Sequence, residues 1–299
     1  MQLLYSIDST NDTTAFKSPV ATLDKNFSKT RELLIFLIYN ILAVAKYAEV
    51  ASRHRSSKHI PTEEDLNVNT KVSGNQLLWQ ILEDKSYQEA VEEYKTKLHS
   101  DNEITRKLYQ ELIETPEYKN YINEQSRDKK NEVEILGFIF NNLMLQHDWF
   151  VSSTEDKFSN WDDDAEMLQV ILNQYLARPQ PLAMHNLLDA DKWNFAKTLL
   201  QTCLDKKAHL LEIISPKFKN WDADRIASLD MIILIMGVSE LLYFETIPTK
   251  VTINEYIDLA KEYSTPQSGQ FVNGILDNLH KELLAAGKIN KVAYKKAHY

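Results

Sequence analysis

The side chains that could do chemistry are few in this sequence and form no recognisable catalytic set. A carboxylate-bridged di-iron site in a helical bundle needs Glu-x-x-His on two helices, and none of the eight histidines has Glu three positions before it. His209 and Glu212 stand in the reverse order, so we interpret them as a surface pair. The single cysteine, Cys203, cannot build a zinc cluster, and no P-loop or paired-glycine dinucleotide motif is present. We therefore expect no enzymatic activity, no metal and no cofactor.

An acidic motif occurs twice, 60 residues apart. The segment K-F-S-N-W-D-D-D at 157–164 recurs as K-F-K-N-W-D-A-D at 217–224, and each copy precedes an apolar helical run. Either Asn160 or Asp162, and in the second copy either Asn220 or Asp222, can cap these helices, where the helix dipole favours acids in the first turn. We interpret the motif as a packing and capping device, so the run Asp162–Asp164 does not indicate a metal site.

The composition predicts a protein built almost entirely of helices. Of 299 residues 43% are hydrophobic, and only six are Gly and eight Pro, which leaves little material for tight hairpin turns. The longest apolar stretch, at 33–45, is too short to span a bilayer and is typical of a buried helix. One cysteine fits a reducing compartment, and no signal peptide opens the chain. We therefore expect a cytoplasmic protein with no membrane contact.

The net charge of −9 argues against nucleic acid, whose phosphates attract Lys and Arg. The charge is uneven, however. Residues 249–299 contain seven Lys against five acids, and the last twelve residues contain four Lys and no acid. This basic tail is either a solvated chain end or, as the less favoured interpretation, a phosphate contact.

Hydrophobic periodicity predicts the order of the helices. The segment 1–7 resembles the end of a helix, a long helix covers about 23–56, and the segment 56–76 is a linker. About three helices follow between 76 and 150. Near the C-terminus, Thr252 to Glu255 fits a capping box, and Thr265-Pro266 supplies an N-cap followed by proline at the first helical position.

Two glycines inside the last predicted helix stand out, because each costs about 1 kcal/mol relative to alanine there. Gly274 lies beside the apolar stripe of Phe271, Ile275 and Leu279, so we expect it to let a neighbouring helix approach closely. Gly269 lies in the first turn, where exposed backbone N–H groups can meet an anion.

The most specific pattern in the chain lies between residues 225 and 277. It comprises R-I-A-S-L-D-M-I-I-L-I-M-G-V-S-E-L at 225–241, I-P-T-K-V-T-I-N-E-Y-I-D-L-A-K-E-Y at 247–263 and S-G-Q-F-V-N-G-I-L-D at 268–277. Near the N-terminus, Q-L-L-Y-S at 2–6 adds a second match. Together these segments resemble the NusB family of transcription antitermination factors.

The resemblance implies an all-α fold of two antiparallel three-helix bundles. Because the family is ordinarily about half this length, the resemblance also implies an inserted helical segment, as in an elongated subfamily. We therefore predict an N-terminal bundle part with a truncated first helix at 1–65, the insertion at 66–150, and a C-terminal NusB-like bundle with a basic tail at 151–299.

The resemblance further implies a function. Members bind boxA-type RNA together with a small-subunit ribosomal protein, NusE, in the RNA polymerase antitermination complex that promotes transcription of ribosomal RNA operons. In the family an Arg-rich segment just before the Q-x-L-Y helix end makes much of the phosphate contact. This chain begins at Met1-Gln2, so we expect either a natural start further upstream or a protein that has lost this arm.

The site residues follow from the same resemblance. Tyr5 matches a tyrosine near the surface for RNA and the ribosomal protein, and Asp230 matches an acidic position that faces the basic partner. Five further residues match family positions on the rim beside the RNA path: Lys250, Gln267, Ser268, Gly269 and Gln270. As simpler alternatives, Tyr5 caps a bundle and Asp230 is a solvated helix acid. Where relatives often carry Lys or His, the uncharged Gly269 and Gln270 predict a weaker phosphate contact.

Two alternatives to an RNA-binding antitermination factor remain. One is a protein-interaction scaffold that kept the bundle but lost RNA affinity, which fits the net charge of −9. The other is the RNA-binding part of an RNA cytosine methyltransferase, which the short segment after Asp277 disfavours.

Overall fold

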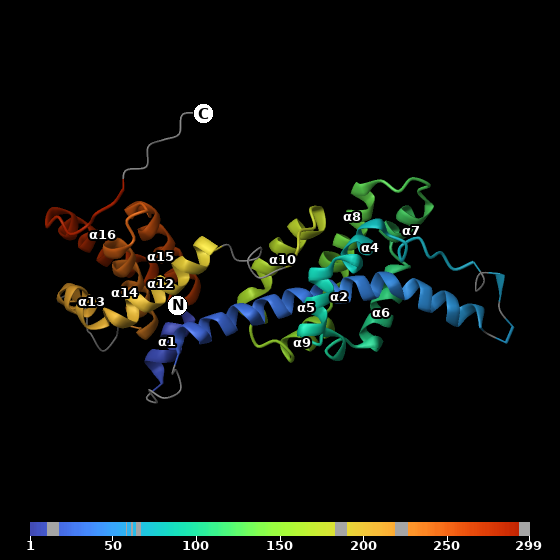
Figure 1. Cartoon of the computed structure of the whole chain (residues 1–299), viewed down its shortest axis with the longest axis horizontal. Coiled ribbons are helices and arrows are strands. Elements are labelled where there is room, and N and C mark those ends of the chain that lie inside the picture. The colour runs from blue at the N-terminus through green and yellow to red at the C-terminus, as the bar shows by residue number, and fades with distance from the viewer. Residues whose placement is uncertain are drawn as a thin grey trace. The chain divides into compact units, whose positions relative to one another are not determined.

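The structure is a computed structural model and describes residues 1–10, 18–57, 59, 60, 62, 63, 67–182, 190–218 and 227–292. Within these ranges every regular element is a helix and none is a strand (Figure 1). The all-α prediction is confirmed. The chain forms two compact units: unit 1 comprises Met1–Lys25 and Ala190–Tyr299, and unit 2 comprises Asn26–Asp189.

Unit 1 is assembled around one central helix, α14 (Ser228–Tyr243), in which every residue from 232 to 241 is buried, including Ser239 and Glu240. A helix that is buried on all sides belongs in the middle of a bundle. Accordingly, five other helices pack against it: α1 (Gln2–Ser9), α12 (Ala190–Asp205), α13 (Lys207–Ile214), α15 (Thr249–Tyr263) and α16 (Ser268–Ala285). A short 3-10 helix, η4 (Ser215–Phe218), follows α13.

Helices α14, α15 and α16 meet at Gly237. A Cβ atom on this residue would lie 3.0 Å from Cδ2 of Leu276 on α16 and 3.3 Å from Cδ2 of Tyr256 on α15. The missing side chain therefore lets three helices pack closely. At Gly274, by contrast, an added Cβ meets nothing within 4 Å. The prediction that Gly274 is the packing glycine is wrong, because this residue lies on the exposed side of α16.

The predicted starts of α15 and α16 also need correction. Helix α15 begins at Thr249, so Thr252 lies inside it, and its buried hydroxyl donates to Glu240 Oε1 at 2.7 Å rather than capping the helix. Helix α16 begins at Ser268, with Gln267 at the N-cap position. Thr265 and Pro266 therefore belong to the preceding turn.

Unit 2 is built along α2 (Pro19–Ser56), whose residues 19–25 belong to unit 1. The remaining helices of unit 2 are α4 (Gln76–Glu83), α5 (Lys85–Glu93), α6 (Asn102–Leu112), α7 (Pro116–Asn123), α8 (Lys129–Phe138), α9 (Asp148–Glu155) and α10 (Trp161–Ala177). Short elements join them: η1 (Thr96–Leu98), the π-helix η2 (Ile139–Leu143) and η3 (Met144–Gln146).

The predicted domain boundaries differ from the division into units. Buried residues of α2, from Leu33 to Ala48, share one hydrophobic core with buried residues between Val72 and Leu182. The inserted segment is thus not a separate body, and the divisions fall at 25/26 and 189/190 rather than at 65/66 and 150/151. The polar composition of the segment 56–76 suggested a boundary, but residues on both sides of it pack in the same hydrophobic core and therefore belong to one unit.

Helix α2 is also the one described helix that is long and apolar enough to cross a membrane by length and composition. Two-thirds of its most apolar window (67%) is buried within the protein. This burial is what a core helix of a bundle requires.

The motif at 157–164 has a packing role. Trp161 is buried, whereas Asn160 makes no side-chain cap and instead donates to Asp164 Oδ2 at 2.6 Å. The same carboxylate oxygen accepts from Thr30 Oγ1 of α2 at 2.7 Å, which ties the start of α10 to α2. The predicted caps of the second copy, Asn220 and Asp222, lie outside the described residues.

Candidate nucleic-acid and partner interface

Four of the predicted site residues lie where α15 gives way to α16: Gln267 is the last residue of the turn, and residues 268–270 are the first of α16. We call residues 264–270 the α15–α16 corner. Gln267 and Gln270 are exposed there, whereas Ser268 and Gly269 are buried. The exposed residues present amide groups to solvent, which can donate to phosphate or base oxygens.

Ser268 is held inside the corner by an acid from α14. Its Oγ donates to Asp230 Oδ2 at 2.8 Å, and Ser268 is only 1% exposed. The Thr265 hydroxyl lies 2.8 Å from Ser268 Oγ, and the Thr265 N–H donates to that oxygen at 3.2 Å. Ser268 therefore joins α14 to the start of α16 and has no free face for RNA.

Asp230 lies in the first turn of α14 and is 5% exposed. The helix dipole favours a carboxylate there, and the interpretation of Asp230 as a solvated helix acid is wrong because the residue is buried. Its second oxygen, Oδ1, has no hydrogen-bond partner. A buried carboxylate oxygen without a donor is costly, so Asp230, which lies beside the corner, has unmet capacity to accept a hydrogen bond.

Gly269 has a packing role that the sequence did not reveal. A Cβ atom there would lie 2.8 Å from Cγ of Lys261 on α15, so a larger residue would displace the Lys261 stem that crosses the first turn of α16. The Lys261 ammonium donates to Asp258 Oδ1 at 2.8 Å, and both side chains are largely exposed. Lys261 is therefore a cation beside the corner that sequence reasoning missed; the glycine opposite it was the available signal.

Lys250 lies at the other end of α15. It is exposed, and 13 helical positions separate it from Tyr263, which corresponds to about 20 Å along the helix axis. The structure therefore does not bring Lys250 together with residues 267–270. A single rim that contains all five predicted residues would have to run the length of α15.

A buried acid of α14, Glu240, accepts hydrogen bonds from α15, the helix that also carries Lys250. Its carboxylate accepts from Thr252 Oγ1 and, at 2.9 Å, from the Tyr256 hydroxyl. Burial, reinforced by this carboxylate, raises the pKa of Tyr256 well above its ordinary value. Lys291 donates to the carbonyls of Glu240 and Phe244 at 3.0 and 2.7 Å, and burial lowers its pKa. This lysine of the basic tail thus caps the C-terminus of α14, and residues 293–299 lie outside the described part.

Tyr5 lies on α1, whose Leu3 and Leu4 are buried in the core of unit 1. The Tyr5 side chain is 42% exposed, so it is available to a partner. At the end of the same helix, Asp8 pairs with Lys207. This ion pair joins α1 to the start of α13.

Comparison with known proteins matches this part of the chain to one family. A model of the NusB family matches residues 157–281, which include the α15–α16 corner, Asp230 and Lys250. A protein from Listeria monocytogenes serotype 4a (strain HCC23), named transcription antitermination protein NusB, is 33% identical over 100 residues. Those residues are 33% of this chain and 78% of that relative. The chain belongs to the NusB family.

Two further NusB relatives are more similar over shorter shares of their length. The protein from Salinibacter ruber is 42% identical over 103 residues, which are 34% of this chain and 64% of that relative. The protein from Methylacidiphilum infernorum is 47% identical over 83 residues, which are 28% of this chain and 58% of that relative. The chain thus spans less than two-thirds of either NusB protein. A search of solved structures gives no match.

The NusB match leaves most of unit 2 without a counterpart, because the family model begins at residue 157. In the part of the chain that the structure describes, no group of three or more His, Cys, Asp or Glu residues could hold a metal ion. The candidate interface is therefore made of amides, hydroxyls, one buried acid and exposed lysines. Such groups can bind RNA or protein by hydrogen bonds and charge.

Proposed function

We propose that this protein is an RNA-binding transcription antitermination factor that acts in the cytoplasm without enzymatic activity. In this proposal it binds boxA-type RNA together with the small-subunit ribosomal protein NusE, as part of the RNA polymerase antitermination complex on ribosomal RNA operons. Membership of the NusB family carries the proposal, because the match includes the corner and Asp230.

The distribution of charge supports an RNA-binding role for unit 1. Unit 1 has 16 Lys and Arg against 16 Asp and Glu, whereas unit 2 has 18 against 27. The whole net charge of −9 therefore belongs to unit 2. The electrostatic argument against nucleic acid applies to unit 2 and not to the unit that carries the NusB signature.

The site residues take different roles in this proposal. Gln267 and Gln270 contact RNA directly with Lys261, Tyr5 lies on the surface shared by RNA and NusE, and Lys250 extends the RNA path along α15. Ser268 and Gly269 shape the corner from inside. The basic ribosomal partner reaches into the corner and donates a hydrogen bond to the free oxygen of Asp230.

The function is tested by measuring affinity for boxA RNA and for scrambled RNA of equal length, with NusE present, from low to moderate salt. We expect boxA RNA to bind more tightly at every salt concentration, with an affinity that falls as salt rises. Equal binding of both RNAs would instead favour a scaffold of NusB fold that has lost RNA affinity, which the burial of Ser268 and Gly269 would explain.

The contribution of Lys261 is tested by Lys261→Gln. Loss of one phosphate contact should weaken binding about three- to tenfold at low salt. It should also make the plot of log binding constant against log salt concentration less steep, by about one unit of slope. Lys281→Gln is the matched control, because Lys281 is an equally exposed lysine that pairs with an acid of its own helix, Asp277. If both variants bind boxA RNA as the wild type does, Lys261 makes no RNA contact.

A further inference from the structure

A hollow of about 370 Å³ lies between α7 and α8 in unit 2, outside the part that matches the NusB family. Its floor is apolar: Tyr121 and Ile135 are buried and Phe138 is half-buried. Its rim carries three exposed carboxylates, from Glu117, Glu124 and Glu134, and no Lys or Arg lines it. Concave sites that combine an apolar floor with a few polar groups are typical binding sites.

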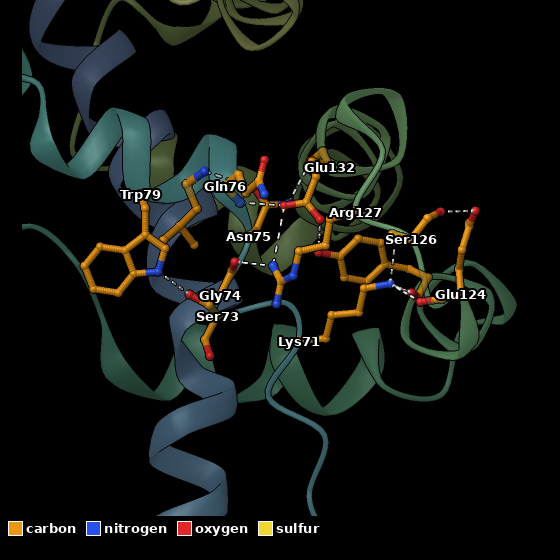
Figure 2. A network of polar contacts seen from close by, with 12 residues as sticks. Lys71, Ser73, Gly74, Asn75, Gln76, Trp79, Glu124, Ser126, Arg127 and Glu132 are labelled. Atoms are coloured by element: carbon orange, nitrogen blue, oxygen red, sulfur yellow. Dashed lines mark hydrogen bonds and ion pairs between the residues drawn. The ribbon is translucent and has the colours of Figure 1, made fainter.

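Lysine and arginine contacts fix the end of α7, whose Tyr121 and Glu124 line this hollow, and Figure 2 shows Lys71 and Arg127 in that polar network. Lys71 Nζ donates to the carbonyls of Tyr121 and Glu124 at 2.6 and 2.5 Å and lies 4.6 Å from the centre of the Tyr121 ring. The buried carboxylate of Glu132 accepts from the Tyr121 hydroxyl at 2.8 Å, and Arg127 lies 3.9 Å from that carboxylate. The end of α7 is therefore fixed before any ligand binds.

The carboxylates of the rim retain capacity for a cation. Glu124 is oriented by two neutral donors, Ser126 Oγ at 2.9 Å and Asn131 Nδ2 at 2.6 Å. Glu134 has an exposed pair with Lys130 at 3.6 Å, which is worth little in water. Neutral donors position Glu124 without cancelling its charge, so the rim remains negative in a unit that itself has nine more acids than bases.

We propose that the hollow between α7 and α8 binds an arginine side chain presented by a partner protein. The methylene stem of arginine packs on the apolar floor, as long cationic side chains do on apolar surfaces. The planar guanidinium matches carboxylate oxygens with paired N–H groups, which an ammonium cannot do. The acidity of unit 2 attracts a basic protein and repels RNA, so unit 2 adds a protein contact to the RNA contact proposed for unit 1.

The binding test uses the full chain and the peptide acetyl-Ala-Gly-Ala-Arg-Ala-Gly-Ala-amide at low salt. Nuclear magnetic resonance of the Ile135 methyl group and of the α7 and α8 amides reports binding at the hollow. We expect saturable shifts there with a dissociation constant of about a millimolar or tighter. The same peptide with citrulline, which has the shape of arginine without its charge, should give no shifts.

The variant Glu117→Gln/Glu124→Gln/Glu134→Gln removes the three rim charges and keeps the shape of the hollow. It should weaken arginine-peptide binding about tenfold. The control Glu89→Gln/Glu155→Gln/Glu166→Gln changes the net charge of unit 2 equally at exposed acids that do not line the hollow. It should bind as the wild type does, and both variants should keep the wild-type melting temperature.

Three results would overturn the proposal: no shifts with the arginine peptide, equal weakening in both triple variants, or shifts that saturate outside α7 and α8. A further measurement uses spermidine in place of the peptide. If spermidine shifts the same resonances with the same dependence on the rim charges while the arginine peptide does not, the hollow binds a small polyamine and the protein-partner proposal fails. Loss of boxA binding would leave this result unaffected, because the peptide assay contains no RNA.

Discussion

Gly237 and Gly274 lie on neighbouring helices of unit 1 and meet opposite surroundings. The site of a Cβ on Gly237 is occupied by Leu276, which is fully buried, while the space beside Gly274 is open. Alanine is about 1 kcal/mol more favourable than glycine inside a helix. Whether a glycine-to-alanine substitution stabilises or destabilises unit 1 therefore depends on the atoms around each site.

We expect Gly237→Ala to lower the free energy of unfolding of unit 1 by about 1–2 kcal/mol, because overpacking outweighs the helical gain. Gly274→Ala should raise it by about 0.5–1 kcal/mol. Cys203, the single cysteine, is buried in unit 1, so its labelling by a thiol reagent across a urea series reports the unfolding of that unit. A stabilising Gly237→Ala would show that Leu276 can move away.

The same two residues show what could be predicted at the scale of single residues. The sequence identified the helix, the apolar stripe and the family, and Phe271, Ile275 and Leu279 are indeed buried. It could not tell which glycine faces a neighbour, since a neighbouring helix leaves no mark in the periodicity of α16. The family resemblance places Ser268 and Gly269 on the rim beside the RNA path, but matching a family position does not reveal that both residues are buried.

Helix α7 is a short element that owes its position to a residue from a distant segment. It has eight residues, and its terminal carbonyls accept from Lys71, as Figure 2 shows. A cation at a helix C-terminus is favoured by the helix dipole. An isolated helix of this length would be unstable in water, so this contact and the buried Tyr118 and Tyr121 hold it.

Replacing Lys71 by methionine should therefore destabilise unit 2 by about 2 kcal/mol, because the variant leaves carbonyls without a donor. Hydrogen exchange of the α7 amides should rise more than that of α2. Lys119→Met is the matched control on α7 itself, since Lys119 forms an exposed pair with Glu114 and should contribute less than about 0.5 kcal/mol. Equal effects of the two substitutions would contradict the role given to Lys71.

Among the helices, sequence reasoning predicts too few short ones in the middle of the chain. About three helices were predicted between 76 and 150, where the structure has α4 to α9. Four polar residues, Asn75, Asp84, Asp101 and Thr115, each accept a hydrogen bond from a backbone N–H of the following helix. These capping residues can be recognised in the sequence. A prediction based on apolar periodicity alone does not use them, and it therefore joins several short helices into one.

At the scale of the whole molecule, the charge of the chain is divided between its units. Unit 2 is one contiguous stretch of the sequence, residues 26–189, and it carries the acidity, whereas unit 1 is neutral, but the sequence does not mark where that stretch begins and ends. The C-terminal signature identified the family correctly. The extent of the units depended on which helices share a core, and that information is absent from composition.

In the proposed function, boxA RNA and NusE bind unit 1. The sharpest test is hydrogen–deuterium exchange of the full chain, with and without both ligands. We predict slower exchange in the α15–α16 corner and at the end of α15 that carries Lys261, with boxA RNA but not with scrambled RNA. Protection by RNA that is confined to residues 26–189, or that is equal for the two RNAs, would show that unit 1 does not bind boxA RNA specifically.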